Sequence, residues 1–307
     1  MLNVFEISRM TNHNGPGIRT LVHFKGCPLR CVWCSTPESQ SREAELGYKV
    51  QRCIGDGACL QACPAHAIRP AAAGEKGLLI DRAKCTGCFA CVRECYAHAF
   101  TRIGRAWSVE ELLKEIRKDE LFFQNSGGGV TFSGGEPLMF VDGDMIELYR
   151  GVKEAGISIG VDTTGFVPWE SIAGVLPFVD FFLWDLKVMD REKHKALTGA
   201  DNRLILENLQ RVEGLFAQYG TRVYVRCIQV PGMTDSDENL LQTCAFLRGM
   251  RCIEEIDLIN FHHMGKKRYE YIQRDYAMDE VEPMEKARLE EKKKLVEAQG
   301  FRCRISS

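Results

Sequence analysis

The chain has 307 residues, of which 45% are hydrophobic and 27% are charged, so its composition is globular, excludes wholesale disorder and leaves room for about two domains. Its 40 basic and 42 acidic side chains give a net charge of −2, without the basic surplus that a nucleic-acid-binding surface needs. No apolar run approaches the ~20 residues of a membrane span, and the N-terminal segment is too polar for a secretory signal, so we expect a cytoplasmic protein.

The first predicted strand, Thr20–Phe24, leads into three closely spaced cysteines, Cys27, Cys31 and Cys34. Ten of the 14 cysteines fall within the 69 residues from Cys27 to Cys95, a density that in a reducing cytosol argues for metal or redox chemistry and against disulfides. Three thiolates on a short loop can bind three irons of a cubane cluster, which leaves a fourth iron open for chemistry, as at catalytic metal sites. A three-ligand zinc site is the alternative.

Two further cysteine runs lie downstream of these three. The second run has the C-x2-C-x2-C-x3-C spacing of bacterial ferredoxins, and the first has the same frame with an aspartate, Asp56, at its second position. In two-cluster ferredoxins the fourth cysteine of each run ligates the other cluster. We therefore expect two auxiliary iron–sulfur clusters, one on Cys63, Cys85, Cys88 and Cys91, and the other on Cys53, Cys59 and Cys95.

The fourth ligand of this last cluster is left open by the sequence. The Asp56 carboxylate can ligate iron, but Gly55 and Gly57 on either side also suit a turn. The alternatives are ligation by Asp56, a solvent-ligated iron, and a cluster of three irons. Iron counting helps to separate them, with about 12 irons per chain for three four-iron clusters and about 11 when one cluster holds three.

Outside the cysteine-rich segment, short apolar runs alternate with amphipathic stretches, as in β/α units, and no internal repeat is evident. The further predicted strands are Val130–Phe132, Ser158–Val161, Phe181–Trp184, Arg222–Val230, Glu255–Asn260 and Arg302–Ile305. The predicted helices are Val109–Lys118, Gly143–Ala155, Trp169–Val175, Asn202–Gln218, Asp237–Gly249 and Glu282–Ala298. We expect an α/β fold, with a partial (β/α)6 TIM-like barrel in residues 1–47 and 103–307 and a ferredoxin-like insert at residues 48–102 that carries two iron–sulfur clusters.

Polar residues cluster just beyond the carboxyl ends of the predicted strands, where barrel active sites are built. In chain order they are Gly134, Gly135 and Glu136 after the second strand, Asp162 and Thr163 after the third, Asp185 and Lys187 after the fourth, Arg226 within the fifth and His262 after the sixth. The other four cysteines, Cys227, Cys244, Cys252 and Cys303, match no ligand spacing, and we interpret them as buried apolar residues. One face of the barrel is thus predicted to hold the chemistry.

Taken together, these motifs resemble the radical S-adenosylmethionine superfamily, and within it the activating enzymes of glycyl radical enzymes, the family typified by the activase of pyruvate formate-lyase. The segments that carry the resemblance are Gly15–Arg19, Cys27–Cys34, Gly129–Pro137, Val161–Gly165, Trp184–Lys187, Val230–Gly232 and Phe261–Gly265. The two-cluster insert is similar to that of the larger subgroup of these activases. The chain departs from the family pattern at Asn14, where an acidic residue is common, and at Ser35-Thr36, where His-Asn is common.

The resemblance implies that S-adenosylmethionine binds the open iron beside Cys27, Cys31 and Cys34. Reductive cleavage then gives a 5′-deoxyadenosyl radical, which takes a hydrogen from a glycine of a partner glycyl radical enzyme. It also implies a flavodoxin or ferredoxin as reductant, a monomeric chain, and a monovalent cation beside Asp162 and Thr163, with Asp185 joining it. Cofactor contacts are implied for Trp33, Gly134, Gly135, Glu136, Asp162, Thr163, Asp185, Lys187, Arg226 and His262, with Lys187 also as a catalytic residue.

The side chains fit these roles. Gly134 and Gly135 allow backbone to approach the methionyl end of the cofactor, and Glu136 can pair with its ammonium. Lys187 and Arg226 can neutralise its carboxylate, and His262 can contact the adenosyl end. The auxiliary clusters would relay electrons or shape a docking surface. Two other classes compete: a radical enzyme that modifies a small molecule or peptide, and an iron–sulfur electron-transfer protein.

Overall fold

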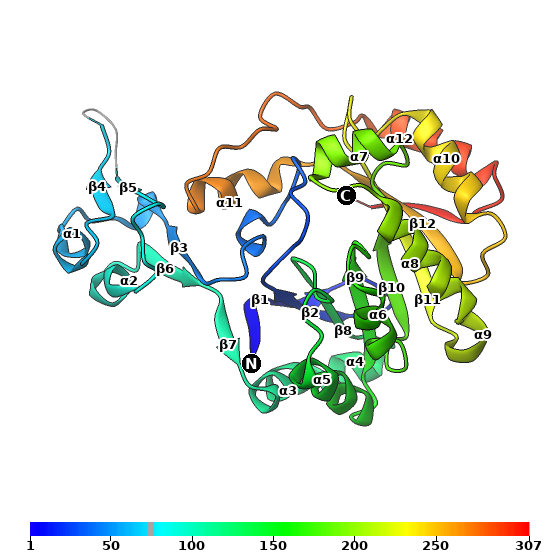
Figure 1. The fold of residues 1–307 in the computed structure, drawn as a ribbon, viewed down its shortest axis with the longest axis horizontal. Helices are drawn as coiled ribbons and strands as arrows, with labels where there is room; N and C mark the ends of the chain where they lie inside the picture. Colours follow the sequence, from blue (N-terminus) through cyan, green and yellow to red (C-terminus); the bar gives the residue numbers. More distant parts are fainter. Residues whose placement is uncertain (73–76, 307) are drawn as a thin grey trace.

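The computed structural model describes residues 1–72 and 77–306 and shows two parts of unequal size (Figure 1). The larger part is built on one nine-stranded sheet, and the smaller part projects from it and contains two short helices and two two-stranded sheets. Within the described residues, no helix is long and apolar enough to cross a membrane.

The nine-stranded sheet is parallel over most of its width. From one edge to the other its strands are β13 (Cys303–Ser306), β12 (Ile253–Asn260), β11 (Arg222–Gln229), β10 (Phe181–Asp185), β9 (Ser158–Thr163), β8 (Gly129–Gly134), β2 (Arg19–Phe24), β1 (Leu2–Thr11) and β7 (Arg105–Trp107). The strands from β13 to β2 are parallel, whereas β1 and β7 run antiparallel to their neighbours. In the described residues the two edges do not pair with each other. The predicted partial barrel is therefore confirmed.

Helices follow the parallel strands, as β/α units require. They are α3 (Val109–Arg117), α4 (Glu120–Ser126), α5 (Gly143–Glu154), α6 (Trp169–Val175), α7 (Arg191–Thr198), α8 (Arg203–Gly214), α9 (Phe216–Tyr219), α10 (Asp237–Leu247), α11 (Lys266–Tyr271) and α12 (Lys286–Glu297). Side-chain caps define several starts, including a capping box in which Ser108 and Glu111 bond each other's backbone at α3. The predicted helix Asn202–Gln218 is two helices, because the chain leaves helical geometry at Leu215.

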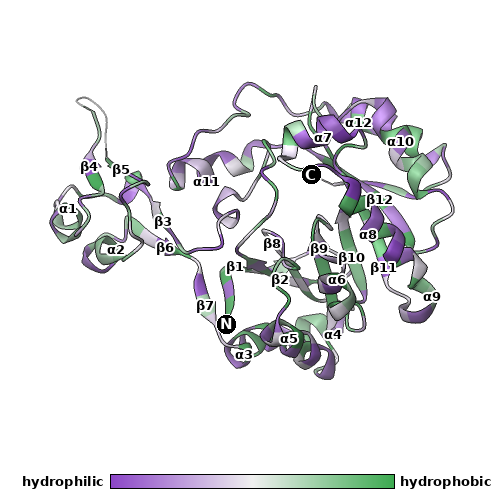
Figure 2. Cartoon of the chain, viewed as in Figure 1, coloured by the Kyte–Doolittle hydropathy of each residue, from purple (hydrophilic) through white to green (hydrophobic). Residues whose placement is uncertain are grey.

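The apolar runs of the strands form the core of the sheet. Val22, Val130, Ile159 and Phe182 are completely buried and belong to one hydrophobic cluster that also includes residues of α3, α5 and α8. Figure 2 shows β10 as mainly hydrophobic, while α8 and α12 present many hydrophilic residues. Burial of these strands explains why their sequences are continuous apolar runs.

The smaller part has a core of its own. Its elements are β3 (Glu45–Tyr48), α1 (Ala58–Ala62), β4 (Ile68–Pro70), β5 (Leu78–Ile80), α2 (Ala90–Glu94) and β6 (Phe100–Ile103). The strands β3 and β6 pair antiparallel, and Tyr48 stacks on Phe100 at a centroid distance of 4.7 Å. Six of the auxiliary-site cysteines pack with these residues in a cluster separate from the main core.

The two cysteine runs of the smaller part are an internal structural repeat with an offset of 32 residues. The helices α1 and α2 occupy equivalent positions, and each begins at a left-handed residue, Gly57 (φ 73°) or Phe89 (φ 55°). The loops after them contain His66 and His98, with φ of 47° and 52°. This repeat lies inside the cysteine-rich segment, outside which no repeat is expected. Besides three cysteines of the ligand frame, the two halves share a glycine, Gly55 or Gly87, an alanine, Ala58 or Ala90, and the sequence Ala-His-Ala at residues 65–67 and 97–99.

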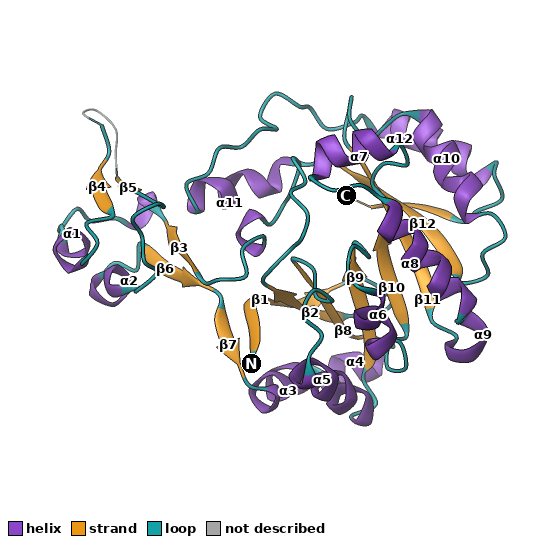
Figure 3. Cartoon of the chain, in the orientation of Figure 1, coloured by secondary structure: helices purple, strands orange, loops and turns teal. Residues whose placement is uncertain are grey.

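Helix α11 lies between the two parts (Figure 3). Arg268 forms ion pairs with Glu38 and with Glu6, and its Nη2 lies 2.9 Å from Glu6 Oε2. The side-chain amide of Gln273, just after the helix, donates to the carbonyl of Leu78 and accepts from the N–H of Ile80. This segment therefore ties the insert to the loop that follows the N-terminal cysteines.

Candidate active site

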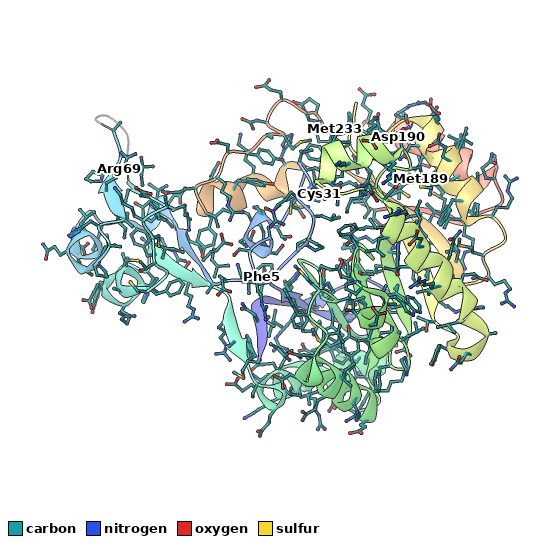
Figure 4. All side chains as sticks on the ribbon, in the orientation of Figure 1. Phe5, Cys31, Arg69, Met189, Asp190 and Met233 are labelled. Carbon is teal, nitrogen blue, oxygen red and sulfur yellow. The ribbon has the colours of Figure 1, made fainter. Side chains whose placement is uncertain are left out.

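A cavity of about 350 Å³ opens at the carboxyl ends of the parallel strands. Its walls include the predicted residues Cys27, Cys31, Trp33, Cys34, Gly134, Gly135, Asp162, Thr163, Asp185, Lys187, Arg226 and His262. These residues come from the ends of five strands, β8 to β12, and from the loop after β2, so the parallel topology has brought them to one face. Figure 4 shows Cys31 on a loop between α11 and α7.

The loop of three cysteines is held by backbone hydrogen bonds. The N–H of Arg30 donates to the carbonyl of Thr198 at 2.7 Å, and that of Val32 donates to the carbonyl of Leu197 at 3.1 Å. Burial raises the pKa of the Cys27 thiol to about 12 and that of Cys31 to about 11. Iron binding must therefore displace thiol protons at neutral pH, as is usual for thiolate ligation.

Gly134 and Gly135 are required by contacts within the chain itself. A Cβ on Gly135 would lie 2.2 Å from the carbonyl oxygen of Gly26, and one on Gly134 would lie 2.6 Å from the backbone nitrogen of Phe24. Gly134 also has φ +108°, which strongly favours glycine. The two glycines were predicted to allow a ligand to come close to the backbone. In the structure they allow the end of β8 to pack against the segment between β2 and Cys27, and both glycines also line the cavity.

Glu136 lies behind the cavity wall. Its side chain is 1% exposed and accepts hydrogen bonds from the hydroxyl of Thr163 (2.7 Å) and from the backbone N–H (2.8 Å) and hydroxyl (2.7 Å) of Thr164. Burial raises the pKa of this carboxyl, while the threonine donors oppose that shift. The expected pairing of Glu136 with the cofactor ammonium does not match this geometry, because the carboxylate is already engaged by the loop after β9. We interpret Glu136 as a positioning residue.

Charged groups of alternating sign line the wall formed by β9, β10 and β11. Arg226 Nη1 lies 3.0 Å from Asp162 Oδ1, and Lys187 Nζ lies 2.8 Å from Asp185 Oδ2. Burial would lower the pKa of Lys187, but Asp185 and the nearby Cys31 outweigh it and raise the pKa, so the ammonium stays charged. The same balance, with Asp162 as the main partner, raises the pKa of Arg226.

Two buried polar atoms in this wall are left without partners. Within residues 1–72 and 77–306, Arg226 Nε and His23 Nδ1 make no hydrogen bond, although both residues line the cavity. Unpaired buried polar atoms are costly, so they indicate a polar ligand. The carboxylate of an amino-acid moiety fits the guanidinium, and the cavity therefore fits S-adenosylmethionine by size and by donor chemistry.

The sequence reasoning missed His23 and Ser133. His23 Nε2 contacts the hydroxyl of Ser8 at 3.2 Å, and the hydroxyl of Ser133 donates to Asp162 at 2.8 Å. Both residues lie in apolar strands that run toward the cavity. A polar side chain near the carboxyl end of such a strand was the available signal.

His262 begins the short turn that precedes α11 and lines the cavity. Its Nδ1 accepts from the N–H of Met264 at 3.4 Å, and burial lowers the pKa of the ring. A neutral imidazole at this position can accept or donate one hydrogen bond to a nucleoside without adding charge. Trp33 is 6% exposed and packs against Val230 and Phe261, so it also supports this side of the cavity.

The first auxiliary set surrounds a second, smaller cavity of about 20 Å³. Its lining includes Cys63, Cys85, Cys88 and Cys91, the four side chains that the ferredoxin spacing grouped together. Burial raises the pKa of Cys91 to about 11, and the neighbouring thiols of Cys85, Cys63 and Cys88 raise it further. The fold therefore brings these four thiols together from two distant runs.

The second auxiliary set lies on the other half of the repeat. Burial raises the pKa of Cys59, and the other groups that raise it are Cys95, Cys53 and Asp56. Asp56 is exposed, and its Oδ1 accepts from the N–H of Ala58 at 3.3 Å. In the parts of the chain that the structure describes, no three Cys, His, Asp or Glu side chains converge on one metal ion. A cubane takes one ligand on each iron, so its thiolates need not converge in that way.

Comparisons with known proteins identify the family of the chain. The radical SAM superfamily profile matches residues 83–244, and the 4Fe-4S dicluster domain profile matches residues 45–96. The chain is 39% identical over 305 residues to the trans-4-hydroxy-L-proline dehydratase activating enzyme of Clostridioides difficile, covering 98% of both chains. It is also 37% identical to the choline trimethylamine-lyase activating enzyme of Oleidesulfovibrio alaskensis, covering 90% of this chain and 88% of that one.

A third relative is the benzylsuccinate synthase activating enzyme of Thauera aromatica, with 39% identity over 88% of this chain and 82% of its own. Among solved structures, Streptococcus suis SuiB bound to precursor peptide SuiA aligns with 92% of this chain and 46% of its own length, at a TM-score of 0.54 and 12% identity. That likeness concerns the fold alone.

Proposed function

The chain belongs to the radical S-adenosylmethionine superfamily and, within it, to the activating enzymes of glycyl radical enzymes, and we propose that its large cavity is where S-adenosylmethionine is bound and cleaved. The chain is thus an iron–sulfur enzyme whose substrate is a partner protein. One observation supports this location of the active site. The thiols of Cys27, Cys31 and Cys34 line the same cavity as charged residues from three neighbouring strands.

We assign the three thiolates to a cluster with one open iron. When bound, the cluster and S-adenosylmethionine supply a 5′-deoxyadenosyl radical that abstracts a hydrogen atom from the partner glycine. Arg226 and Lys187 bind and orient the carboxylate of the methionyl group, and His262 contacts the nucleoside. A monovalent cation is proposed beside Asp162, Thr163 and Asp185, because these side chains provide hard oxygen ligands on the same wall.

Residues 48–102 are proposed to fold as a separate unit that holds two auxiliary clusters, for three clusters in all. The separate core and the two groups of cysteines support this assignment. A flavodoxin or ferredoxin is the proposed electron donor to a monomeric chain. The insert clusters relay its electrons, and the connection through α11 supports that role because α11 contacts both parts.

The partner is a glycyl radical enzyme, and the relatives do not single out which one. Identities of 39%, 37% and 39% are shared with activating enzymes named for a dehydratase, a lyase and a synthase. The test incubates the reconstituted chain, S-adenosylmethionine and dithionite anaerobically with purified members of each class. We expect a glycyl radical doublet in the electron paramagnetic resonance spectrum with one class. Cleavage of S-adenosylmethionine without a doublet on any partner, but with turnover of a small molecule, would contradict the proposal.

A further inference from the structure

The two halves of the insert allow an internal comparison of Asp56 with Cys88. Each residue precedes the left-handed residue that starts a helix, and each follows a glycine of positive φ, 75° at Gly55 and 68° at Gly87. The Asp56 carboxylate accepts from the N–H of Ala58, two residues on, at 3.3 Å. The Cys88 sulfur accepts from the N–H of Ala90, also two residues on. The two side chains therefore point the same way from the same backbone.

The equivalence extends to the other ligands of the two runs. Cys63 Sγ accepts from the N–H of Ala67 at 3.3 Å, and Cys95 Sγ accepts from that of Ala99 at 3.2 Å. Both cysteines also accept at their backbone carbonyls, from His66 (3.1 Å) and His98 (3.0 Å). A frame this similar would hold two clusters in the same geometry. The ligand position that Cys88 fills in one half is filled by Asp56 in the other.

A turn residue is the alternative interpretation of Asp56. The bond to Ala58 explains a turn, but Cys88 makes the same bond with a thiol, so that bond does not require an aspartate. Within residues 1–72 and 77–306, Asp56 has no ion-pair partner, and its second carboxylate oxygen has no hydrogen bond. The oxygens of an aspartate lie one bond further from Cβ than the sulfur of a cysteine. From the equivalent backbone position, Asp56 can therefore reach its own cluster at the distance over which Cys88 reaches the other cluster.

We propose that Asp56 ligates the fourth iron of the auxiliary cluster held by Cys53, Cys59 and Cys95, and that this iron is the exchangeable one of the insert. The inference rests on the proposed function in that it requires clusters in the insert. A carboxylate is a harder and less strongly donating ligand to iron than a thiolate. This corner therefore releases ferrous iron first. One-electron oxidation of the remaining core by ferricyanide then leaves a three-iron cluster, with ferricyanide reduced to ferrocyanide.

The test reconstitutes the full chain anaerobically and compares it with three variants. Asp56→Cys restores the thiol frame, Asp56→Asn keeps an oxygen that can accept from Ala58 but removes the carboxylate, and Cys88→Asp moves the proposed feature to the other half. Asp81→Asn is the matched control, because Asp81 also caps a turn of the insert, accepting from Ala83 at 3.1 Å, without a place in the ligand frame. Iron content and electron paramagnetic resonance are measured before and after two equivalents of ferricyanide, one for each insert cluster, with excess S-adenosylmethionine present to occupy the open iron of the N-terminal cluster.

We expect wild type and Asp81→Asn to fall from about 12 to about 11 irons per chain and to gain a three-iron signal. Asp56→Cys should keep about 12 irons without that signal, Asp56→Asn should already hold about 11 irons before oxidation and show the signal after it, and Cys88→Asp should lose about two irons. Equal iron and equal spectra for wild type, Asp56→Cys and Asp56→Asn would overturn the proposal. Loading of only about 4 irons in every chain would instead show that the insert holds no cluster, which also overturns the three-cluster assignment.

Discussion

Arg226 on β11 and Asp162 on β9 form an ion pair of 3.0 Å across the intervening strand β10. Parallel register places Asp185, at the end of β10, directly beside Arg226. The guanidinium is therefore paired with one carboxylate and close to a second, yet among the described residues its Nε has no hydrogen-bond partner. Such a group is already oriented when a ligand carboxylate arrives, which reduces the entropy cost of binding.

Replacing Arg226 with Gln should weaken the binding of S-adenosylmethionine by about 10- to 100-fold, the value of a charge-assisted hydrogen bond. The Asp162 carboxylate would also remain in the cavity and repel that of the cofactor. Equilibrium dialysis of the iron-loaded chain gives the dissociation constant. Arg222→Gln is the matched control, because Arg222 lies on the same strand at its exposed end. Equal affinities for the two variants would remove Arg226 from the binding site.

Glu136→Gln should lower the free energy of unfolding by about 2–4 kcal/mol. An amide in place of the buried carboxylate turns an N–H₂ group toward donors from Thr163 and Thr164, so at least one donor loses its acceptor. Urea denaturation of the metal-free chain measures the loss, with the exposed Glu147→Gln as control. A change no larger than that of the control would mean that these hydrogen bonds do not stabilise the loop.

Arg268→Gln tests the connection through α11. Glu38 is only 2% exposed, and loss of its ion-pair partner leaves a buried charge, at a cost of about 3–5 kcal/mol. Glu38 follows the loop of N-terminal cysteines closely, so iron at that cluster should also be released faster to a chelator. Lys267→Gln, one residue away and exposed, should release iron as the wild type does. Identical rates in the two variants would contradict the coupling.

Asp237 gives the fold a dependence on acid pH. The ammonium of Lys292 donates to Asp237 at 2.8 Å and is the main cause that lowers the pKa of this carboxyl. Because the folded pKa lies below the unfolded one, near 3.9, the contribution is present above that pH and is lost as pH falls through the folded pKa. Asp237→Asn should lower Tm at pH 7, and the difference from wild type should shrink below pH 4. A constant difference would argue against the pair.

Much of the fold was predictable because buried parallel strands have continuous apolar sequences, as in β8 and β10. The strand β1 was missed, since its residues from Phe5 to Arg9 are only half-buried and mix apolar with polar types. Helix α7 was missed because its sequence, Arg191–Thr198, is short and largely polar. Local patterns predict elements well when burial is uniform, and these two elements lack that uniformity.

For the candidate site, the sequence identified which residues meet but not how they bond. The cysteines, Arg226 and His262 were predicted from their positions after strands. The role of Glu136 was not, because its partners Thr163 and Thr164 lie 27 and 28 residues away and only the folded chain brings them together. The spacing also placed Asp56 at the position of Cys88, but not the matching backbone angles of Gly55 and Gly87 that precede them.

The most direct measurement incubates the iron-loaded chain anaerobically with S-adenosylmethionine and the reductant dithionite. The 5′-deoxyadenosine formed is separated and quantified by chromatography. The account predicts this product from wild type and none from Cys34→Ala, whose N-terminal cluster lacks one of its three thiolates. A fully iron-loaded wild-type chain that binds S-adenosylmethionine but yields no 5′-deoxyadenosine would contradict it.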